Sequence, residues 1–367
     1  MLIVEGNAQV DNQRVNSYDL LKIAGTIIIV CTHYQQFTKT VFTYGVNFYG
    51  GKFSFGYFVE MFFIVSGLLA ARGVLKSQAS GCRVSFKEYI SRKIIRLLPM
   101  TGITAIVYEI AIYYFSHYTT REWVNRGTVL SFWGTVTNII GMQIGWSFKD
   151  YKINSITWYV SVLLLCHILY FFIDWLAARC RISVIYLVIG MILLGVGIIS
   201  YKINLPFLNG FTGRGYSSFF VGILMGYYPP RKSYQRMRQV AFLAFGAIAM
   251  VLALAVFKYS LVKDGIGFTM TFIFFPALVW LMGLPGVVAF LNNRIIERLA
   301  VISFDVYVWQ LVGILILLTV HDVYRLDFPI ESRTTMLMFV VFLYLWGFVS
   351  NRFITQPVTD TLRKIID

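Results

Sequence analysis

Long apolar runs alternate with short polar segments along the whole chain. A run of about 20 apolar residues is long enough to cross a bilayer as an α-helix. The run at 214–228 is shorter and rich in Gly and aromatic residues, which makes it the weakest. The pattern predicts an all-α, polytopic integral membrane bundle of about ten transmembrane helices, at 18–37, 53–75, 97–116, 155–175, 182–200, 214–228, 239–258, 266–284, 298–320 and 334–353.

One further apolar run, 128–148, is rich in Gly, Thr and Trp. Irregular backbone exposed to lipid would leave its polar groups without hydrogen bonds. We therefore expect this run to be interfacial or re-entrant. An even number of spans puts both termini on one side. Because no internal repeat and no soluble appended domain is apparent, the sequence predicts one integral membrane domain over residues 1–367, with cytoplasmic tails at 1–17 and 354–367.

Composition agrees with a membrane protein and excludes other classes. Hydrophobic side chains make up 58% of the chain and charged ones 13%, against about 45–50% and about 25% in soluble domains. A soluble chain of this length has no core large enough for that surplus. Intrinsic disorder, a coiled coil and a disulfide scaffold are excluded too. The four cysteines have no metal-ligand spacing, so no metal site is expected.

The charge balance is strongly basic, with 32 Lys and Arg against 17 Asp and Glu. In a soluble chain this would suggest nucleic acid as a partner. The densest basic clusters, Arg83–Arg96 and Arg231–Arg238, both fall on the side of the N-terminus. The positive-inside rule then predicts an N-in, C-in orientation. We expect the lipid bilayer, and not nucleic acid, as a partner.

Ionisable side chains within predicted spans are candidates for function, because they are costly to bury in lipid. Most charged residues of the spans lie at the span ends, where snorkelling to the membrane surface explains them. Six ionisable residues lie away from the ends. They are Lys22, His33, Glu60, Glu109, His167 and Asp305. Glu109 and His167 are expected to line the bundle interior. Asp305 could form an interhelical hydrogen-bond cluster with Ser303 and Tyr307.

Lys22 and His33 lie eleven residues apart in the first span. This spacing puts both on one helix face, about 16 Å apart along the axis. A cation at one end of a polar stripe and an imidazole at the other suits a donor that enters from the cytoplasm. The alternative is that Lys22 snorkels to the interface and His33 reaches a headgroup or a carbonyl.

Glu60 lies deep in the second span, in Phe58-Val59-Glu60-Met61-Phe62. A carboxylate there needs a partner, and His33 or Lys22 on the neighbouring helix is plausible. A carboxylate that orients an imidazole is a common way to activate a base. The alternative is a purely structural ion pair.

The segment Tyr89–Pro99 carries Arg92, Lys93 and Arg96 just inside the membrane. On a helix, Arg92 and Arg96 face the same way. That face could hold the phosphates of a nucleotide-type donor. It could equally be a positive-inside anchor that binds anionic lipid.

Three segments together resemble the acyltransferase-3 family of integral membrane acyltransferases. Tyr18–Ala24 with His33-Tyr34 resembles its first helix, where an Arg and a His stand ten residues apart. Glu60–Gly67 is similar to its acidic-x-Phe-Phe-x-x-Ser-Gly motif, and Arg92-Lys93-x-x-Arg96-x-x-Pro99 to its Arg-rich third motif. Weaker similarities follow at 158–162, 302–307 and 353–357, so the resemblance covers nearly the whole chain.

The resemblance implies about ten transmembrane helices and transfer of an acyl group, commonly acetyl, to a carbohydrate hydroxyl. The donor would be acyl-CoA (acetyl-CoA) from the cytoplasm, with no permanently bound cofactor. His33 would be the catalytic base, with Lys22 and Glu60 in the catalytic site. Arg92, Lys93 and Arg96 would bind the donor phosphates. The location would be a cell membrane, such as a bacterial plasma membrane.

Three positions depart from the family pattern. Lys22 stands where the family has Arg, Leu163 where many members have Glu, and Gln310 near a position where many have His. Lys keeps the charge but loses the bidentate fork of Arg. A degenerate, inactive member of the family therefore stays open. A non-catalytic transporter or flippase also stays open, because the polar residues of the first span and an aromatic-rich bundle would suit a solute pathway equally well.

Overall fold

The computed structural model describes residues 16–51, 53, 55–81, 84–118, 132–146, 154–228, 234–257 and 265–366. Over these ranges the chain is helical and has no β-strand, which confirms the predicted all-α class. Several residues used in the sequence predictions lie outside the described ones: the tail up to residue 15, Cys82, Arg83, the ends of the 128–148 run, and Arg231 with Lys232.

In the described ranges, each of the ten predicted spans coincides with a helix or with consecutive helical segments. Nine are single α-helices: α1 (Asn16–Thr38), α2 (Phe58–Ala79), α3 (Phe86–Ser116), α6 (Trp158–Cys180), α7 (Val184–Ser200), α8 (Gly210–Tyr227), α9 (Tyr234–Phe257), α14 (Arg294–Asp322) and α15 (Arg333–Ser350). The tenth joins α11 (Ile266–Thr269), the π-helical segment η3 (Met270–Phe274) and α12 (Phe275–Met282).

Length and hydropathy single out six described helical stretches that could cross a membrane, and two shorter apolar ones, Val184–Ser200 and Ile266–Met282. Together they identify a multi-pass membrane protein. Helices α1 and α8 are also long enough but carry more polar residues. These are the helices that bear Lys22, His33 and, as described below, Arg214.

Two helical regions extend beyond the predicted spans. Helix α3 begins at Phe86 because the Ser85 side chain accepts a hydrogen bond from the Glu88 amide (3.2 Å) and caps the helix. Beyond α15 the chain continues through the π-helical segment η4 (Asn351–Thr355) into α16 (Gln356–Ile366). The expected C-terminal tail is therefore largely helical.

The run predicted to be interfacial or re-entrant contains α5 (Phe132–Ile139), which is too short to cross a bilayer. Ile139 packs against Gly102 of α3. The turn that follows buries Gln143, whose backbone carbonyl accepts a hydrogen bond from Ser161 (2.8 Å). The part of this run that the structure describes thus folds back onto α3 and α6 as a non-spanning element.

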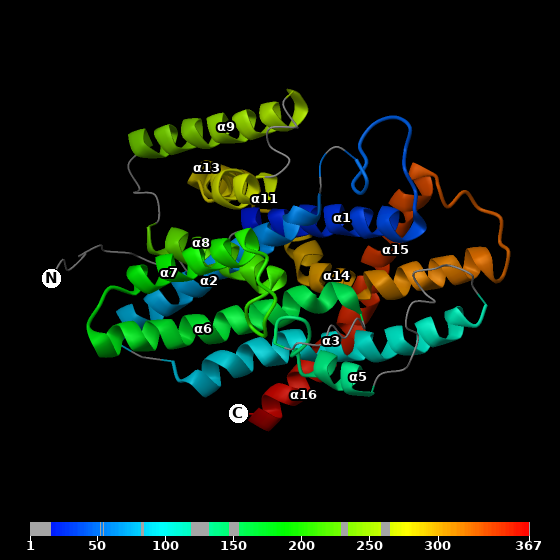
Figure 1. Ribbon diagram of the computed structural model, residues 1–367, viewed down its shortest axis with the longest axis horizontal. Coiled ribbons are helices and arrows are strands. Elements are labelled where there is room, and N and C mark those ends of the chain that lie inside the picture. Colours follow the sequence, from blue (N-terminus) through cyan, green and yellow to red (C-terminus); the bar gives the residue numbers. More distant parts are fainter. Residues whose placement is uncertain are drawn as a thin grey trace.

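Helices α1, α3, α6 and α9 run roughly alongside one another, and α15 and α16 cross them at a steep angle (Figure 1). Helix α9 lies along one edge of the molecule, with α11–α13 between it and the rest, where α13 is Pro285–Phe290. The beginning of α1 and the end of α15 lie at the same end, because Tyr18 and Asn351 line one cavity there. This placement agrees with the prediction that both termini lie on one side.

Helices α2 and α8 pack closely through small residues. A Cβ atom on Gly67 would lie 2.0 Å from the backbone oxygen of Phe219, and one on Gly222 would lie 2.0 Å from that of Ile64. Only glycine fits at either position. The two backbones therefore approach each other directly, which fixes how the first turns of α2 and α8 face each other.

Candidate functional site

A basic cavity of about 640 Å³ opens at the end of the bundle where α1 and α14 begin. Helices α1, α2, α3, α14 and α16 with η4 contribute to its walls. Its basic residues outnumber its acidic ones. The basic residues are Lys22, Arg72, Lys76, Arg96 and Arg363, and the acidic ones are Asp19, Asp305 and Asp360.

A narrower inner pocket of about 200 Å³ continues from the basic cavity into the bundle. The two share Lys22, Leu69 and Arg96 in their walls. Deeper in, the inner pocket is mostly apolar and aromatic, with Phe62, Leu163, Tyr159 and Tyr307 among its lining residues. A molecule with a charged head and a long, less polar arm could fill both spaces.

Lys22 lines both spaces and is held at the entrance. Its Nζ atom donates a hydrogen bond to Asp19 Oδ1 at 2.9 Å, and the Asp19 side chain is buried. The pairing with a buried carboxylate orients the ammonium group. The structure thus places Lys22 at the mouth of the inner pocket, as the predicted polar stripe of α1 requires.

The three basic residues of the Arg-rich motif do not all lie on one face of α3. Lys93 and Arg96, one turn apart on α3, line the inner pocket. The Arg92 side chain is 69% exposed and pairs with Glu88 on the outer face of the helix. The prediction that Arg92 shares a binding face with Arg96 was therefore wrong in one respect: Lys93, not Arg92, accompanies Arg96 in the pocket wall.

His33 lies further along α1 than Lys22 and Thr26. Its Nδ1 atom is 3.1 Å from Oε1 of Gln310 on α14. The Gln310 amide is itself fixed, because its Nε2 donates to the Tyr307 carbonyl at 2.9 Å. Thr26 on α1 and Tyr307 on α14 line the inner pocket. His33 and Gln310 follow on those two faces, so the pair lies beyond the deep end of the pocket.

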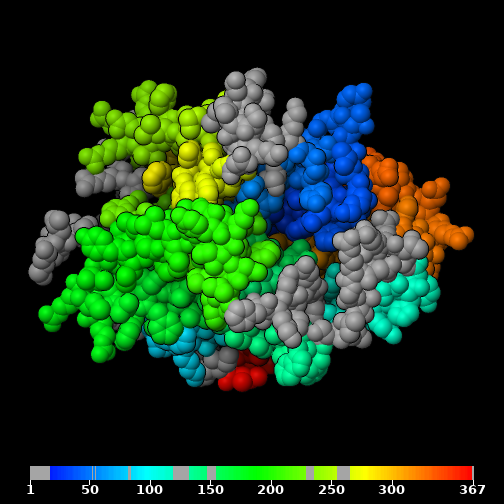
Figure 2. Space-filling view, viewed as in Figure 1, coloured from blue at the N-terminus to red at the C-terminus, as the bar shows by residue number. Residues whose placement is uncertain are grey.

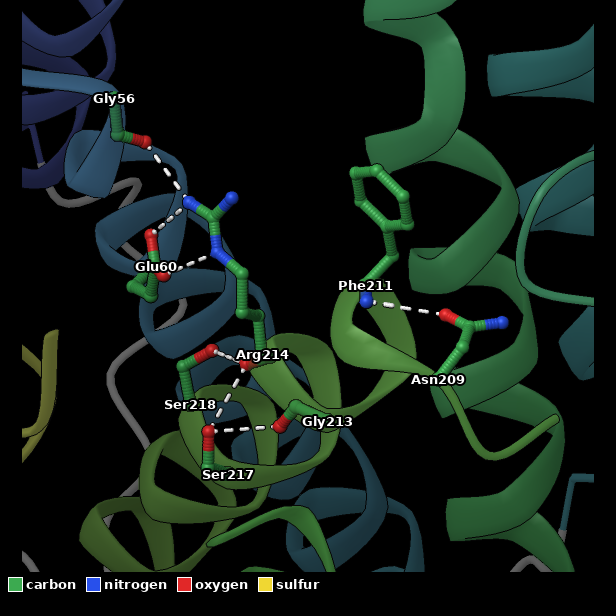
Figure 3. Close-up of polar contacts among 8 residues, drawn as sticks. All are labelled: Gly56, Glu60, Asn209, Phe211, Gly213, Arg214, Ser217 and Ser218. Carbon is green, nitrogen blue, oxygen red and sulfur yellow. Dashed lines mark hydrogen bonds and ion pairs between the residues drawn. The ribbon is translucent and has the colours of Figure 1, made fainter. Parts of the chain in front are cut away.

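The sequence suggested that Glu60 orients His33, but in the structure the partner of Glu60 is Arg214. Both of its carboxylate oxygens bind Arg214 of α8: Oε1 accepts from Nε at 2.6 Å and Oε2 from Nη2 at 2.9 Å (Figure 3). Arg214 Nη2 also donates to the Gly56 carbonyl at 3.0 Å. The Glu60 side chain is only 3% exposed, so it needs this compensating charge. Gln310, a neutral residue, is the partner of His33.

Arg214 is the residue that sequence reasoning missed. It was not among the candidates because it stands at the first position of the weakest predicted span, 214–228, where span ends were set aside. Asn209 caps α8 by accepting hydrogen bonds from the amides of Phe211 and Thr212, so the helix begins early enough to include Arg214. The signal in the sequence was Glu60 itself, because a carboxylate deep in the second span requires a buried cation nearby.

Two further buried candidates have structural partners. Asp305 accepts hydrogen bonds from Ser350 (3.1 Å), Asn351 (2.9 Å) and Thr355, and so binds η4 to α14. The predicted cluster with Ser303 and Tyr307 was therefore wrong in its partners. His167 lines the inner pocket, and its Nδ1 atom lies 2.9 Å from the Tyr89 hydroxyl.

No set of three or more His, Cys, Asp or Glu side chains in the described ranges comes together to hold a metal ion. The chemistry available at the inner pocket is that of an imidazole, an ammonium group, guanidinium groups and hydroxyls. Such groups can bind an anionic donor and move a proton.

A family model described as an acyltransferase domain, that of the acyltransferase-3 family, matches residues 15–351. No curated protein and no solved structure matches the chain. The matched range includes α1, α2, α3 and α14, and so covers His33, Lys22, Glu60 and the Arg-rich motif.

Removing one charge of the Glu60–Arg214 pair should destabilise the bundle more than removing both. Glu60→Gln leaves a cation without its carboxylate, at a cost of about 3–5 kcal/mol. The double variant Glu60→Gln with Arg214→Gln should recover part of that loss, because neither charge stays unpaired. Thermal unfolding of the purified protein in detergent measures both variants.

The control for this comparison is the exposed pair Arg92–Glu88, which is also one carboxylate and one guanidinium. Glu88→Gln should change the unfolding temperature little, because exposed ion pairs contribute little to stability. A double variant no more stable than Glu60→Gln alone would contradict the assignment of the pair as a buried structural contact.

Proposed function

Because the chain belongs to the acyltransferase-3 family of membrane acyltransferases, we propose that it transfers an acetyl group from acetyl-CoA to a hydroxyl of a carbohydrate, such as a cell-surface glycan precursor. The proposed location is a bacterial plasma membrane, with the basic cavity facing the cytoplasm. The observation that carries this proposal is the continuity of the basic cavity with an apolar inner pocket that leads toward His33.

The two connected spaces suit the two halves of an acyl-CoA. Its nucleotide end carries phosphate groups, which bind well to Arg and Lys side chains. Arg72, Lys76, Arg96 and Arg363 supply such groups in the basic cavity. The slender arm that ends in the thioester is far less polar, and it would extend between Leu69 and Leu163 in the inner pocket.

Lys22 would anchor the donor and would not touch the reacting carbonyl. Lys22 and His33 are eleven residues apart on one helix, or about 16 Å along its axis. An ammonium group at that distance cannot stabilise an oxyanion that forms beside His33. It can hold a phosphate or the polar part of the arm at the pocket entrance, where it lies.

His33 would act as the general base. Gln310 Oε1 can only accept a hydrogen bond, and its orientation is fixed by the contact to Tyr307. His33 therefore carries its proton on Nδ1, and Nε2 has a free lone pair. Nε2 would take the proton of the acceptor hydroxyl while the oxygen attacks the thioester carbonyl. The C–S bond then breaks, and the departing thiolate takes that proton from Nε2.

The donor-binding role predicts a difference between neighbouring basic residues of α3. Lys93→Ala or Arg96→Ala should raise the KM for acetyl-CoA about tenfold, because each removes a charge-assisted hydrogen bond from the pocket wall. Arg92→Ala is the matched control and should leave this KM unchanged, because Arg92 lies on the outer face. Initial rates with ¹⁴C-labelled acetyl-CoA give the KM of all three variants. An equally large rise in KM for Arg92→Ala would contradict the assignment of donor binding to Lys93 and Arg96.

The catalytic role predicts that His33→Ala lowers the transfer rate by about 10²- to 10⁴-fold.

Gln310→Ala should lower kcat about ten- to a hundredfold through loss of ring orientation, with little change in the KM for acetyl-CoA. Gln310→His keeps an acceptor for the Nδ1 proton and should restore much of the rate. Retained transfer in His33→Ala membranes that contain normal amounts of the protein would refute the assignment, and solute movement without acyl transfer would favour a transporter.

A further inference from the structure

An aromatic cavity of about 740 Å³ opens at the end of the bundle opposite the basic cavity. Its lining includes Tyr57, Glu60, Lys202, Phe211, Arg214 and Phe268. These residues come from the beginnings of α2 and α8, the α7–α8 connection and α11. The surfaces of these segments, blue, green and yellow, meet on the face shown in Figure 2.

Arg214 is held rigidly in the wall of this cavity. Its guanidinium group lies 4.9 Å from the Trp158 ring and 5.8 Å from the Tyr57 ring. Glu60 and Gly56 bind Nε and Nη2. The third nitrogen, Nη1, points away from Glu60 in Figure 3 and has no hydrogen-bond partner among the described residues. A fixed, positively charged donor is therefore free to bind a ligand.

The aromatic cavity and the inner pocket are separated by the first turn of α6. Trp158 packs against Arg214, whereas the next residue, Tyr159, lines the inner pocket. Phe63 of α2 contacts both rings, with centroids 6.0 Å from Trp158 and 4.7 Å from Tyr159. Aromatic rings of α2 and α6 thus lie between two spaces that open at opposite ends of the bundle.

We propose that the aromatic cavity is the acceptor site, and that it binds a sugar ring by its hydroxyls and its apolar face. This inference rests on the proposed function and adds to it the place and the chemistry of acceptor binding. Arg214 Nη1 donates to a ring or hydroxyl oxygen, and Lys202 binds the acceptor at the rim. Tyr57, Phe211 and Phe268 provide apolar faces for the ring.

The composition of the cavity favours a sugar over a second nucleotide. Glu60 neutralises Arg214, and Lys202 is the other charged residue among the described ones that line this cavity, whereas five basic side chains line the basic cavity. The remaining lining includes three aromatic residues and four isoleucines. A few fixed polar groups among aromatic and aliphatic side chains are typical of a site for a neutral or weakly charged small molecule. The volume lies within the usual range of about 300–1,000 Å³ for ligand sites.

Binding and transfer are measured separately, so that the proposal can fail independently of the acyltransferase activity. The full chain in lipid nanodiscs is dialysed against the tritium-labelled glycan fraction of cells from which this chain has been deleted. Phe268→Ala and Lys202→Ala should each raise the dissociation constant about three- to tenfold. Their dissociation constants for acetyl-CoA should stay at the wild-type value.

Two matched controls have the same chemistry outside the cavity. Phe290, which is 87% exposed, does not line the cavity, so Phe290→Ala should not weaken binding. Lys39 is an exposed lysine with φ 60°, close to the 51° of Lys202, so Lys39→Ala has a similar backbone effect. Wild-type binding without acyl transfer would refute only the proposed function. Absence of wild-type glycan binding, or equal losses in variants and controls, would overturn the acceptor site.

Discussion

The ion pair between Glu60 and Arg214 is the contact on which the arrangement of the bundle depends. A carboxylate that is 3% exposed within a membrane domain is tolerable only with a cation beside it. The glycine contacts between α2 and α8 bring the two backbones close enough for both carboxylate oxygens to reach the guanidinium group. Close packing and charge pairing therefore require each other.

This contact also divides the interior into two spaces. On one side lie the aromatic cavity and the free edge of Arg214; on the other lie the inner pocket and the basic cavity. The wall between them consists of aromatic rings from α2 and α6. Such a wall keeps a bundle with a cavity at each end from forming an open channel through which solutes would leak.

Much of the fold could be predicted from the hydrophobic pattern, because helix length and apolar runs are local properties of the chain. The long helices coincide with the predicted spans for that reason, whereas the short helices α5 and α13 match none of them. Pairings between helices are not local. The sequence showed that Glu60 needs a partner, yet His33 and Lys22 were the candidates, since Arg214 stood at the edge of the weakest span. Its correct place depends on the cap that Asn209 forms on α8.

For the polar stripe of α1, formed by Lys22 and His33, the spacing along the helix was informative about position. Lys22 and His33 share a face of α1 because their separation is close to three turns, and the cavity that Lys22 lines runs toward His33. The Arg-rich motif was only partly predictable. Its helical periodicity allows either Arg92 with Arg96 or Lys93 with Arg96 to face inward, and packing of α3 against α6 and α14 selects the second.

The central claim is that donor and acceptor reach His33 from opposite ends of the bundle. Sealed membrane vesicles of known orientation, with ¹⁴C-labelled acetyl-CoA supplied to one face at a time, test it most directly. The account predicts labelled glycan only when acetyl-CoA is on the face that carries the basic cavity, and it predicts that the label appears on the opposite face. Labelling only from the opposite face, or label retained on the face where acetyl-CoA was added, would contradict the account.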